Sequence, residues 1–144
     1  MSETNTCIPC TGTDTGTIPN NGVILDIPNQ NPPLQATASQ LSKILTTIEN
    51  EILPKTKKGI QKGNKVFGAA LLNQNFDCIL AETNDELNNP LFHGEIVLIN
   101  SWAKKTNACD RGQQAREAIF VSTHEPCCMC IRCVLLCCTR SFFM

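Results

Sequence analysis

The stretch that decides the fold is Phe92-His93-Gly94-Glu95-Ile96-Val97-Leu98-Ile99, and it acts together with Glu125-Pro126-Cys127-Cys128-Met129-Cys130 further along the chain. Apolar residues continue at helical spacing from the first stretch to about Lys105, which predicts a largely buried helix. Pro126 suits the first turn of a second helix, from Cys127 to Cys138, because its missing N–H costs nothing there. Side chains that bind metals or move protons therefore stand at two predicted helix starts.

These side chains have the chemistry of a catalytic zinc site. Cys127 and Cys130 are three residues apart, so their sulfurs project from one face of a helix start, where the positive potential favours thiolates. His93 completes three protein ligands and leaves a fourth position open for water, as in catalytic zinc sites. Glu95 is not expected to be a ligand. Its carboxylate is expected to take a proton from that water and return protons to a substrate nitrogen and to leaving ammonia.

Upstream of these stretches, the sequence predicts one helix and one hairpin. Apolar residues form a single stripe from Ala38 to Leu53, and Pro54 is expected to end that helix. The lysine-rich segment from Lys55 to Lys65 is predicted as a solvated loop. Two short apolar runs, Val66 to Leu72 and Phe76 to Ala81, are joined by a polar connection and predict an antiparallel hairpin.

Downstream of the first stretch, residues 106–117 are polar and predict a connection. The apolar run from Ala118 to Val121 predicts a buried strand, and residues 140–144 are expected to begin another. The order of these elements predicts an α/β protein, a three-layer αβα sandwich with a mixed central sheet. We assign this domain to residues 37–144. Residues 1–36 are rich in Thr, Asn, Gly and Pro and predict a poorly structured arm.

Composition limits the classes of protein to consider. The 144 residues suffice for one domain with its own core, and 42% hydrophobic with 17% charged residues is typical of a globular protein. The net charge is −1 and lysines cluster only at Lys55-Thr56-Lys57-Lys58, so nucleic acid is possible but not the favoured partner. No run approaches the roughly 18 apolar residues of a membrane span, so no membrane partner is expected.

Ten cysteines in a chain of this length raise the question of disulfides. The first forty residues contain no apolar run typical of a signal peptide, so we expect a cytoplasmic, reducing compartment. Metal ligands and buried thiols are then favoured over a disulfide framework. Cys128 is expected to be a packed thiol rather than a ligand. His124 is expected to be a satisfied polar residue or part of a pocket wall.

His93-Gly94-Glu95 with Pro126-Cys127-Cys128-Met129-Cys130 resembles the H-x-E…P-C-x-x-C signature of the zinc-dependent cytidine deaminase-like superfamily. The segment from Glu125 to Cys130 is most similar to the branch containing tRNA adenosine deaminases, guanine deaminases and fungal-type cytosine deaminases. The resemblance covers about Ala38 to Met144. It implies a Zn²⁺ cofactor held by His93, Cys127 and Cys130, with Glu95 as the catalytic acid and base.

The resemblance also implies features outside the two motifs. In that superfamily an Asn in the loop after the second strand contacts the substrate, and Asn84 occupies a matching place, with Asn88 and Asn89 as close competitors. Members usually continue past the second metal helix with two full strands and further helices, so we expect a C-terminally shortened sandwich. A homo-oligomer is implied as well.

Three functions are compatible with these observations. The favoured one is zinc-dependent hydrolytic deamination of a free nucleobase or nucleoside, because the charge distribution does not suggest a polyanionic partner. The alternative is an adenosine or cytidine deaminase acting on tRNA or another nucleic acid, whose target base must be unpaired or flipped into the pocket. The third is a catalytically silent zinc-binding partner subunit, suggested by the short C-terminal part.

Overall fold

A four-stranded sheet forms the centre of the chain in the computed structural model, which describes residues 36–137 and 140–143. Its strands are β1 (Gly68–Leu72), β2 (Cys78–Thr83), β3 (Ile119–Ser122) and β4 (Arg140–Phe143). Their order across the sheet is β2-β1-β3-β4. β1 pairs antiparallel with both β2 and β3, whereas β3 and β4 are parallel. The predicted mixed sheet is confirmed.

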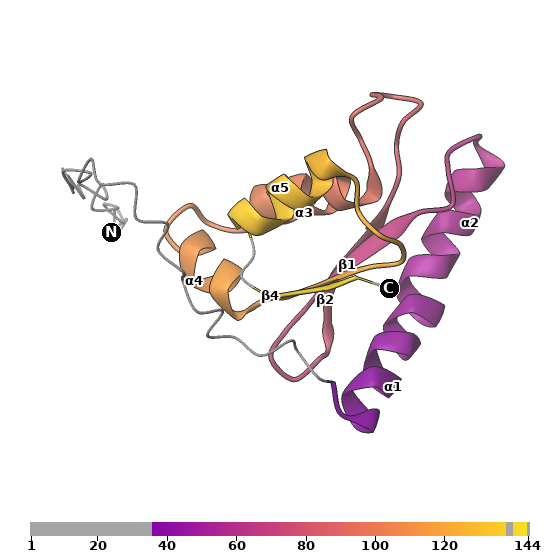
Figure 1. Ribbon diagram of the computed structural model, residues 1–144. Helices are drawn as coiled ribbons and strands as arrows, with labels where there is room; N and C mark the ends of the chain where they lie inside the picture. Colours follow the sequence, from indigo (N-terminus) through magenta and orange to yellow (C-terminus); the bar gives the residue numbers. More distant parts are fainter. Residues whose placement is uncertain (1–35, 138–139, 144) are drawn as a thin grey trace, which may run out of the picture. The chain divides into compact units, whose positions relative to one another are not determined.

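Helices cover both faces of this sheet (Figure 1). One layer is a continuous helical run made of α1 (Ala38–Thr47), the π-helix η1 (Ile48–Ile52) and α2 (Leu53–Gln61). The other layer holds α3 (Gly94–Lys105) and α5 (Cys128–Cys137), which lie side by side. A short helix, α4 (Arg111–Glu117), precedes β3. The α/β class and the three-layer αβα sandwich predicted from the sequence are therefore confirmed.

The core is divided in two by the sheet, because successive residues of a strand point to opposite faces. The strand residues that pack toward α1 and η1 are Ala70, Leu72, Ala81, Ile119 and Val121, together with Ile44 and Ile52 of that layer. Those that pack toward α3 and α5 are Ala69, Leu71 and Phe120, together with Leu98, Trp102 and Val134. Both layers are thus fixed to the sheet by buried apolar side chains.

The first helical layer is longer than the sequence predicted. Pro54 does not end it: the run continues to Gln61, so most of the predicted loop from Lys55 to Lys65 is helical. Pro54 stands in the first turn of α2, directly after η1. The preceding η1 makes room for it, since the Leu53 N–H bonds to the Ile48 carbonyl five residues earlier.

Residues 106–117, predicted as a connection, contain α4. Arg111 at its start donates hydrogen bonds to the Ala103 and Thr106 carbonyls, at 2.7 and 3.2 Å, and so satisfies acceptors at the end of α3. The predicted hairpin, the helices of both motifs and the strands on either side of α5 are present.

Of the predicted arm at residues 1–36, all but the last residue lies outside the described part of the chain, so the domain division stays a prediction. None of the described helices combines the length and apolar character needed to cross a membrane.

Candidate metal centre

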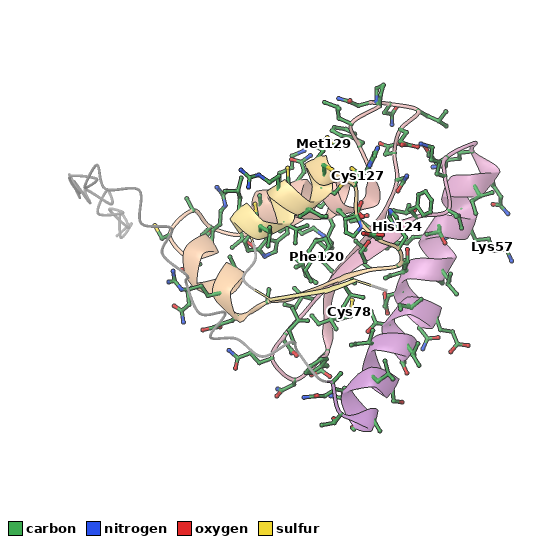
Figure 2. All side chains as sticks on the ribbon, viewed as in Figure 1. Lys57, Cys78, Phe120, His124, Cys127 and Met129 are labelled. Atoms are coloured by element: carbon green, nitrogen blue, oxygen red, sulfur yellow. The ribbon has the colours of Figure 1, made fainter. Side chains whose placement is uncertain are left out.

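Three side chains from two separate segments converge at the N-terminal end of α5, where Figure 2 labels Cys127. The His93 Nδ1 atom lies 3.6 Å from the Sγ atoms of both Cys127 and Cys130. The two sulfurs are 3.5 Å apart, and all three atoms fall within 4.8 Å of one another. The structure thus brings together the three residues predicted as metal ligands.

These separations fit a tetrahedral zinc ion. With Zn–S about 2.3 Å and Zn–N about 2.0–2.1 Å, tetrahedral angles place the sulfurs roughly 3.8 Å apart and the nitrogen about 3.6 Å from each. The observed separations are 3.5 Å between sulfurs and 3.6 Å from nitrogen to each sulfur. One imidazole and two thiols are also a donor set typical of zinc, and three protein ligands leave a fourth position open. The residues present therefore fit the metal.

The ligands are held at two helix starts. His93 is the N-cap of α3, with extended backbone angles of −62° and 156°, and its side chain takes no part in capping. The Cys127 carbonyl accepts the Ile131 N–H at 2.9 Å, which begins the hydrogen bonding of α5. Cys130 lies in the first turn of α5 and is buried. The N-terminal ends of both helices therefore lie at the cluster.

The start of α3 is packed directly against β1. A Cβ atom added to Gly94 would lie 3.1 Å from the Gly68 Cα, so a glycine allows this close approach. The Gly94 N–H donates to Asn84 Oδ1 at 2.9 Å, which satisfies one of the open N–H groups of the helix start. The backbone between His93 and Glu95 is thereby fixed against the sheet.

Glu95 is fully buried, which is rare for a carboxylate. Its Oε1 accepts a hydrogen bond from Ser122 Oγ at 3.0 Å, and His124 Nε2 lies 3.5 Å from the same oxygen. Its Oε2 has no hydrogen-bond partner among the described residues. A buried carboxylate oxygen without a partner costs free energy, so this oxygen has room for a hydrogen bond from a ligand or a water molecule.

His124, which Figure 2 labels, lies beside Glu95. Its ring stacks on Phe67, with centroids 4.0 Å apart and 25° between the ring planes. Its Nδ1 is buried and lacks a hydrogen-bond partner within the described part of the chain, so this histidine is not the fully satisfied polar residue expected as one alternative. Sequence reasoning did not pair Glu95 with Ser122. The signal was present, because Ser122 follows Phe120 by two residues and so faces α3.

The second ring nitrogen of His93 faces a carboxylate that neither motif contains. Glu86 Oε1 lies 3.2 Å from His93 Nε2 and 3.0 Å from Lys65 Nζ. The hydrogen bond from Lys65 is the main reason that the pKa of Glu86 lies below its ordinary value, and a hydrogen bond from the Asn84 side chain lowers this pKa further. No sequence pattern identified Glu86, because it lies in a polar loop seven residues before the ligand.

Asn84, predicted to contact the substrate, is buried and partly engaged. Its Oδ1 accepts the Gly94 N–H, and its amide NH₂ group donates to Glu86. An amide nitrogen carries two donors, so a second N–H is left for another partner. The competing residues Asn88 and Asn89 are hydrogen-bonded within their own loop.

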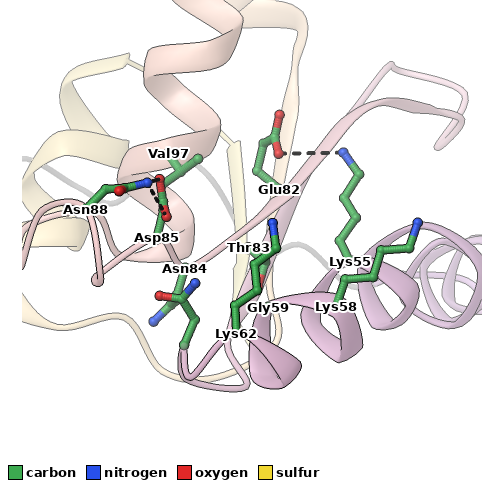
Figure 3. A pocket seen from close by; sticks show the side chains of 11 residues that line it. Lys55, Lys58, Gly59, Lys62, Glu82, Thr83, Asn84, Asp85, Asn88 and Val97 are labelled. Atoms are coloured by element: carbon green, nitrogen blue, oxygen red, sulfur yellow. Dashed lines mark hydrogen bonds and ion pairs between the residues drawn. The ribbon is translucent and has the colours of Figure 1, made fainter.

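Asn84 also lines a pocket of about 440 Å³ beside α2 (Figure 3). Three lysines on α2 and at its C-terminus, Lys55, Lys58 and Lys62, contribute to its wall. Lys55 Nζ lies 3.6 Å from Glu82 Oε2, so part of the positive charge is balanced. The segment predicted to be a solvated loop thus forms one side of a hollow.

The thiols of this region differ in their environments. Burial raises the pKa of the Cys130 thiol far above its ordinary value, and the negative charge of Glu95 raises it further. A cation bound to the sulfur opposes both effects, so metal binding here releases a proton. Cys128 is exposed, and the prediction of a packed thiol is wrong. It follows Cys127 by one residue, which turns its side chain about 100° away around the helix.

Known proteins share both the sequence pattern and the fold. A family model described as the cytidine and deoxycytidylate deaminase zinc-binding region matches residues 44–144. No curated protein matches the chain significantly. Among solved structures, a guanine deaminase from Bacillus subtilis is 19% identical with a TM-score of 0.51, over 69% of this chain and 62% of that one.

Two further solved structures are similar. One comes from biochemical and structural studies of A-to-I editing by tRNA:A34 deaminases; it is 26% identical, with a TM-score of 0.50, over 65% of this chain and 70% of that one. The other was solved in complex with 2,6-diaminopurine and is 22% identical, with a TM-score of 0.51, over 74% of this chain and 56% of that one. This chain therefore spans less than two thirds of the length of the guanine deaminase, and more than two thirds of the length of the tRNA:A34 deaminase structure.

Proposed function

The chain belongs to the family of the cytidine and deoxycytidylate deaminase zinc-binding region, and from this premise we propose that it is a zinc-dependent hydrolytic deaminase of a free nucleobase or nucleoside. The observation that carries the proposal is the fully buried Glu95 carboxylate, whose Oε2 is unpaired among the described residues. It lies close enough to the ligand cluster for its charge to act on the Cys130 thiol.

His93 Nδ1, Cys127 Sγ and Cys130 Sγ are the atoms proposed to hold Zn²⁺, because their separations match a tetrahedral site. Bound there, zinc supplies a Lewis acid and brings the pKa of water at its open position to about 7. The protein's own contribution is to fix the three donors at two rigid helix starts and to place a carboxylate beside them.

Glu95 is proposed to move the protons. Its Oε2 takes a proton from the attacking water and delivers it to the ring nitrogen next to the carbon that bears the amino group. It then carries the second proton of that water to the amino group, which leaves as ammonia. A C–O bond forms, a C–N bond breaks, and no oxidant or reductant is needed. Burial excludes bulk water from competing for these protons.

Ser122 and His124 are proposed to keep Glu95 in position. The Ser122 hydroxyl donates to Oε1 at 3.0 Å, and His124 Nε2 approaches the same oxygen at 3.5 Å. Both contacts use one carboxylate oxygen and leave the other for the reaction. A general acid or base must be held within hydrogen-bond reach of the proton that it transfers, so these contacts orient the catalytic group.

The remaining amide N–H of Asn84 is the proposed contact to an acceptor atom on the substrate base. The overall net charge of −1 supports a small substrate rather than a polyanion. We place the enzyme in the cytoplasm on the sequence expectation of a reducing compartment. The thiols of Cys78, Cys133 and Cys137 are free, whereas Cys109 is disulfide-bonded. A homo-oligomer remains part of the proposal on family resemblance.

The test measures zinc content and ammonia release for the wild-type chain and Glu95→Gln. The substrates are cytosine, guanine, adenine, their nucleosides and a tRNA anticodon stem-loop. We expect about one zinc per chain in both proteins and a loss of turnover of at least 10²-fold in the variant, because proton transfer contributes that much. Zinc-free wild-type protein would refute the site. Bound zinc without turnover on any substrate would instead favour a silent partner subunit.

One observation favours nucleic-acid deamination as the second candidate. The pocket beside Asn84 is walled by Lys55, Lys58 and Lys62, and lysines on one side of a hollow can bind phosphates (Figure 3). In this case the stem-loop would be the best substrate, and binding would weaken steeply as salt rises. Absence of RNA binding at low salt would exclude this candidate.

A further inference from the structure

The imidazole of His93 has polar contacts on both sides. Nδ1 faces the sulfurs of Cys127 and Cys130, each at 3.6 Å. Nε2 faces Glu86, whose Oε1 lies 3.2 Å away. The ring therefore lies between two thiols and one carboxylate, and each of its nitrogens has a different kind of partner.

Glu86 is itself held from two directions. Lys65, in the turn between α2 and β1, contacts Glu86 Oε1 at 3.0 Å, and the buried Asn84 side chain donates a further hydrogen bond. The carboxyl side chain is only 16% exposed, whereas the Lys65 side chain is 62% exposed. The carboxylate is thus shielded and directed at the ring, and the lysine reaches it from solvent.

A histidine binds a metal through a neutral imidazole, so the nitrogen that is not bound must carry the proton. A carboxylate that accepts this proton in a hydrogen bond fixes the tautomer and the ring orientation, and raises the basicity of the metal-binding nitrogen. Glu86 is the described carboxylate placed to accept from His93 Nε2.

We propose that Glu86 is a positioning residue for the metal centre: it accepts the His93 Nε2–H and so presents Nδ1 to the zinc, while Lys65 and Asn84 hold its carboxylate. The proposal rests on the ligand set proposed above. A proton fixed on Nε2 of His93 affects metal binding only if Nδ1 of the same ring binds the metal. It goes beyond that set by assigning a role to the polar loop between β2 and α3.

A purely structural role makes a different prediction. In that case the Lys65–Glu86 ion pair would tether the loop to the turn before β1, and removing either partner would have the same small effect. Metal affinity would not change. A positioning role instead predicts that replacing Glu86 weakens metal binding more than replacing Lys65 does, because only Glu86 contacts His93.

The experiment measures the zinc dissociation constant of the full chain by competition with a chromophoric chelator. We expect Glu86→Ala to weaken zinc binding about 10–100-fold, the range found for the loss of such partners. Glu86→Gln keeps an acceptor oxygen and should fall between Glu86→Ala and wild type, while Lys65→Met should have a smaller effect than Glu86→Ala. Glu82→Gln removes a similar lysine–carboxylate pair on β2 and should leave the affinity unchanged.

A second readout is the visible absorption of the Co²⁺-loaded protein, which reports the ligand field without any turnover. Glu86→Ala should shift these bands and Glu82→Gln should not, and circular dichroism of the zinc-free variants checks that they fold. Wild-type affinity and spectra in both Glu86 variants would overturn the positioning role alone. Zinc binding that His93→Ala does not weaken would overturn the ligand set and, with it, this role.

Discussion

Replacing Gly68 by alanine tests whether the sheet is as closely packed beside the candidate site as the structure indicates. A Cβ atom at this position would lie 2.5 Å from Ile52 Cγ2, 3.0 Å from the Glu82 carbonyl oxygen and 3.1 Å from Thr56 Cγ2. Ile52 is completely buried and Thr56 nearly so, and a carbonyl of the paired strand cannot move independently.

The expected cost follows from these distances. Carbon atoms in contact normally lie about 3.5–4.0 Å apart, so the added methyl group requires η1 to move away from β1 by roughly 1 Å. Overpacking of this kind costs about 1–3 kcal/mol of folding free energy. For domains of 60–100 residues each kcal/mol lowers Tm by about 4–8 °C, so we expect a clear decrease.

Gly112→Ala is the matched control. This glycine lies in α4, and an added Cβ would meet no atom within 4 Å. Alanine is favoured over glycine in a helix by roughly 0.8–1.0 kcal/mol, so the same chemical change should slightly stabilise the protein. Both variants are compared with wild type by urea unfolding under reducing conditions. Equal or greater stability of Gly68→Ala, with an unchanged m value, would refute the close packing described here.

Two further predictions concern the site. Ser122→Ala should lower turnover by about tenfold or more without reducing zinc content. Glu95 loses its closest hydrogen-bond donor in this variant, and a hydrogen bond to a charged group is worth about 1.5–3 kcal/mol. An unchanged kcat would contradict the orienting role of Ser122. Cys127→Ser should lose zinc, measured by metal analysis after dialysis, while Cys128→Ser should retain it, because only the first sulfur faces His93; equal zinc content in the two variants would contradict the assignment.

The architecture could be predicted because its elements have strong local patterns. The apolar runs of β1 and β3 are short and bounded by polar residues, and the helices of both motifs have apolar residues at helical spacing. Pro54 misled the prediction because proline usually ends a helix. Whether a π turn will accommodate it depends on packing between the helix and the sheet, which local sequence does not contain.

The candidate site was predictable to the extent that its chemistry lies in spaced motifs. His93, Cys127 and Cys130 were identified because metal ligands recur at such spacings, and their atoms lie together. The partners of these residues come from other segments. Glu86 reaches His93 from a loop, and Ser122 reaches Glu95 from the end of β3, so their roles depend on tertiary contacts that no spacing rule describes.

The π-helix η1 also determines how homologous sequences can be aligned with this one. A π turn accommodates one residue more than an α turn, so deleting one residue from η1 would leave a regular α-helix and keep α2 in the same orientation. Thr56 and Gly59, which lie against Gly68 and Thr83, would keep their places on the sheet. A relative with a one-residue gap at this turn should therefore carry similar side chains on the sheet-facing side of α2, whereas a one-residue gap elsewhere in the helical run would turn that side about 100° away from the sheet.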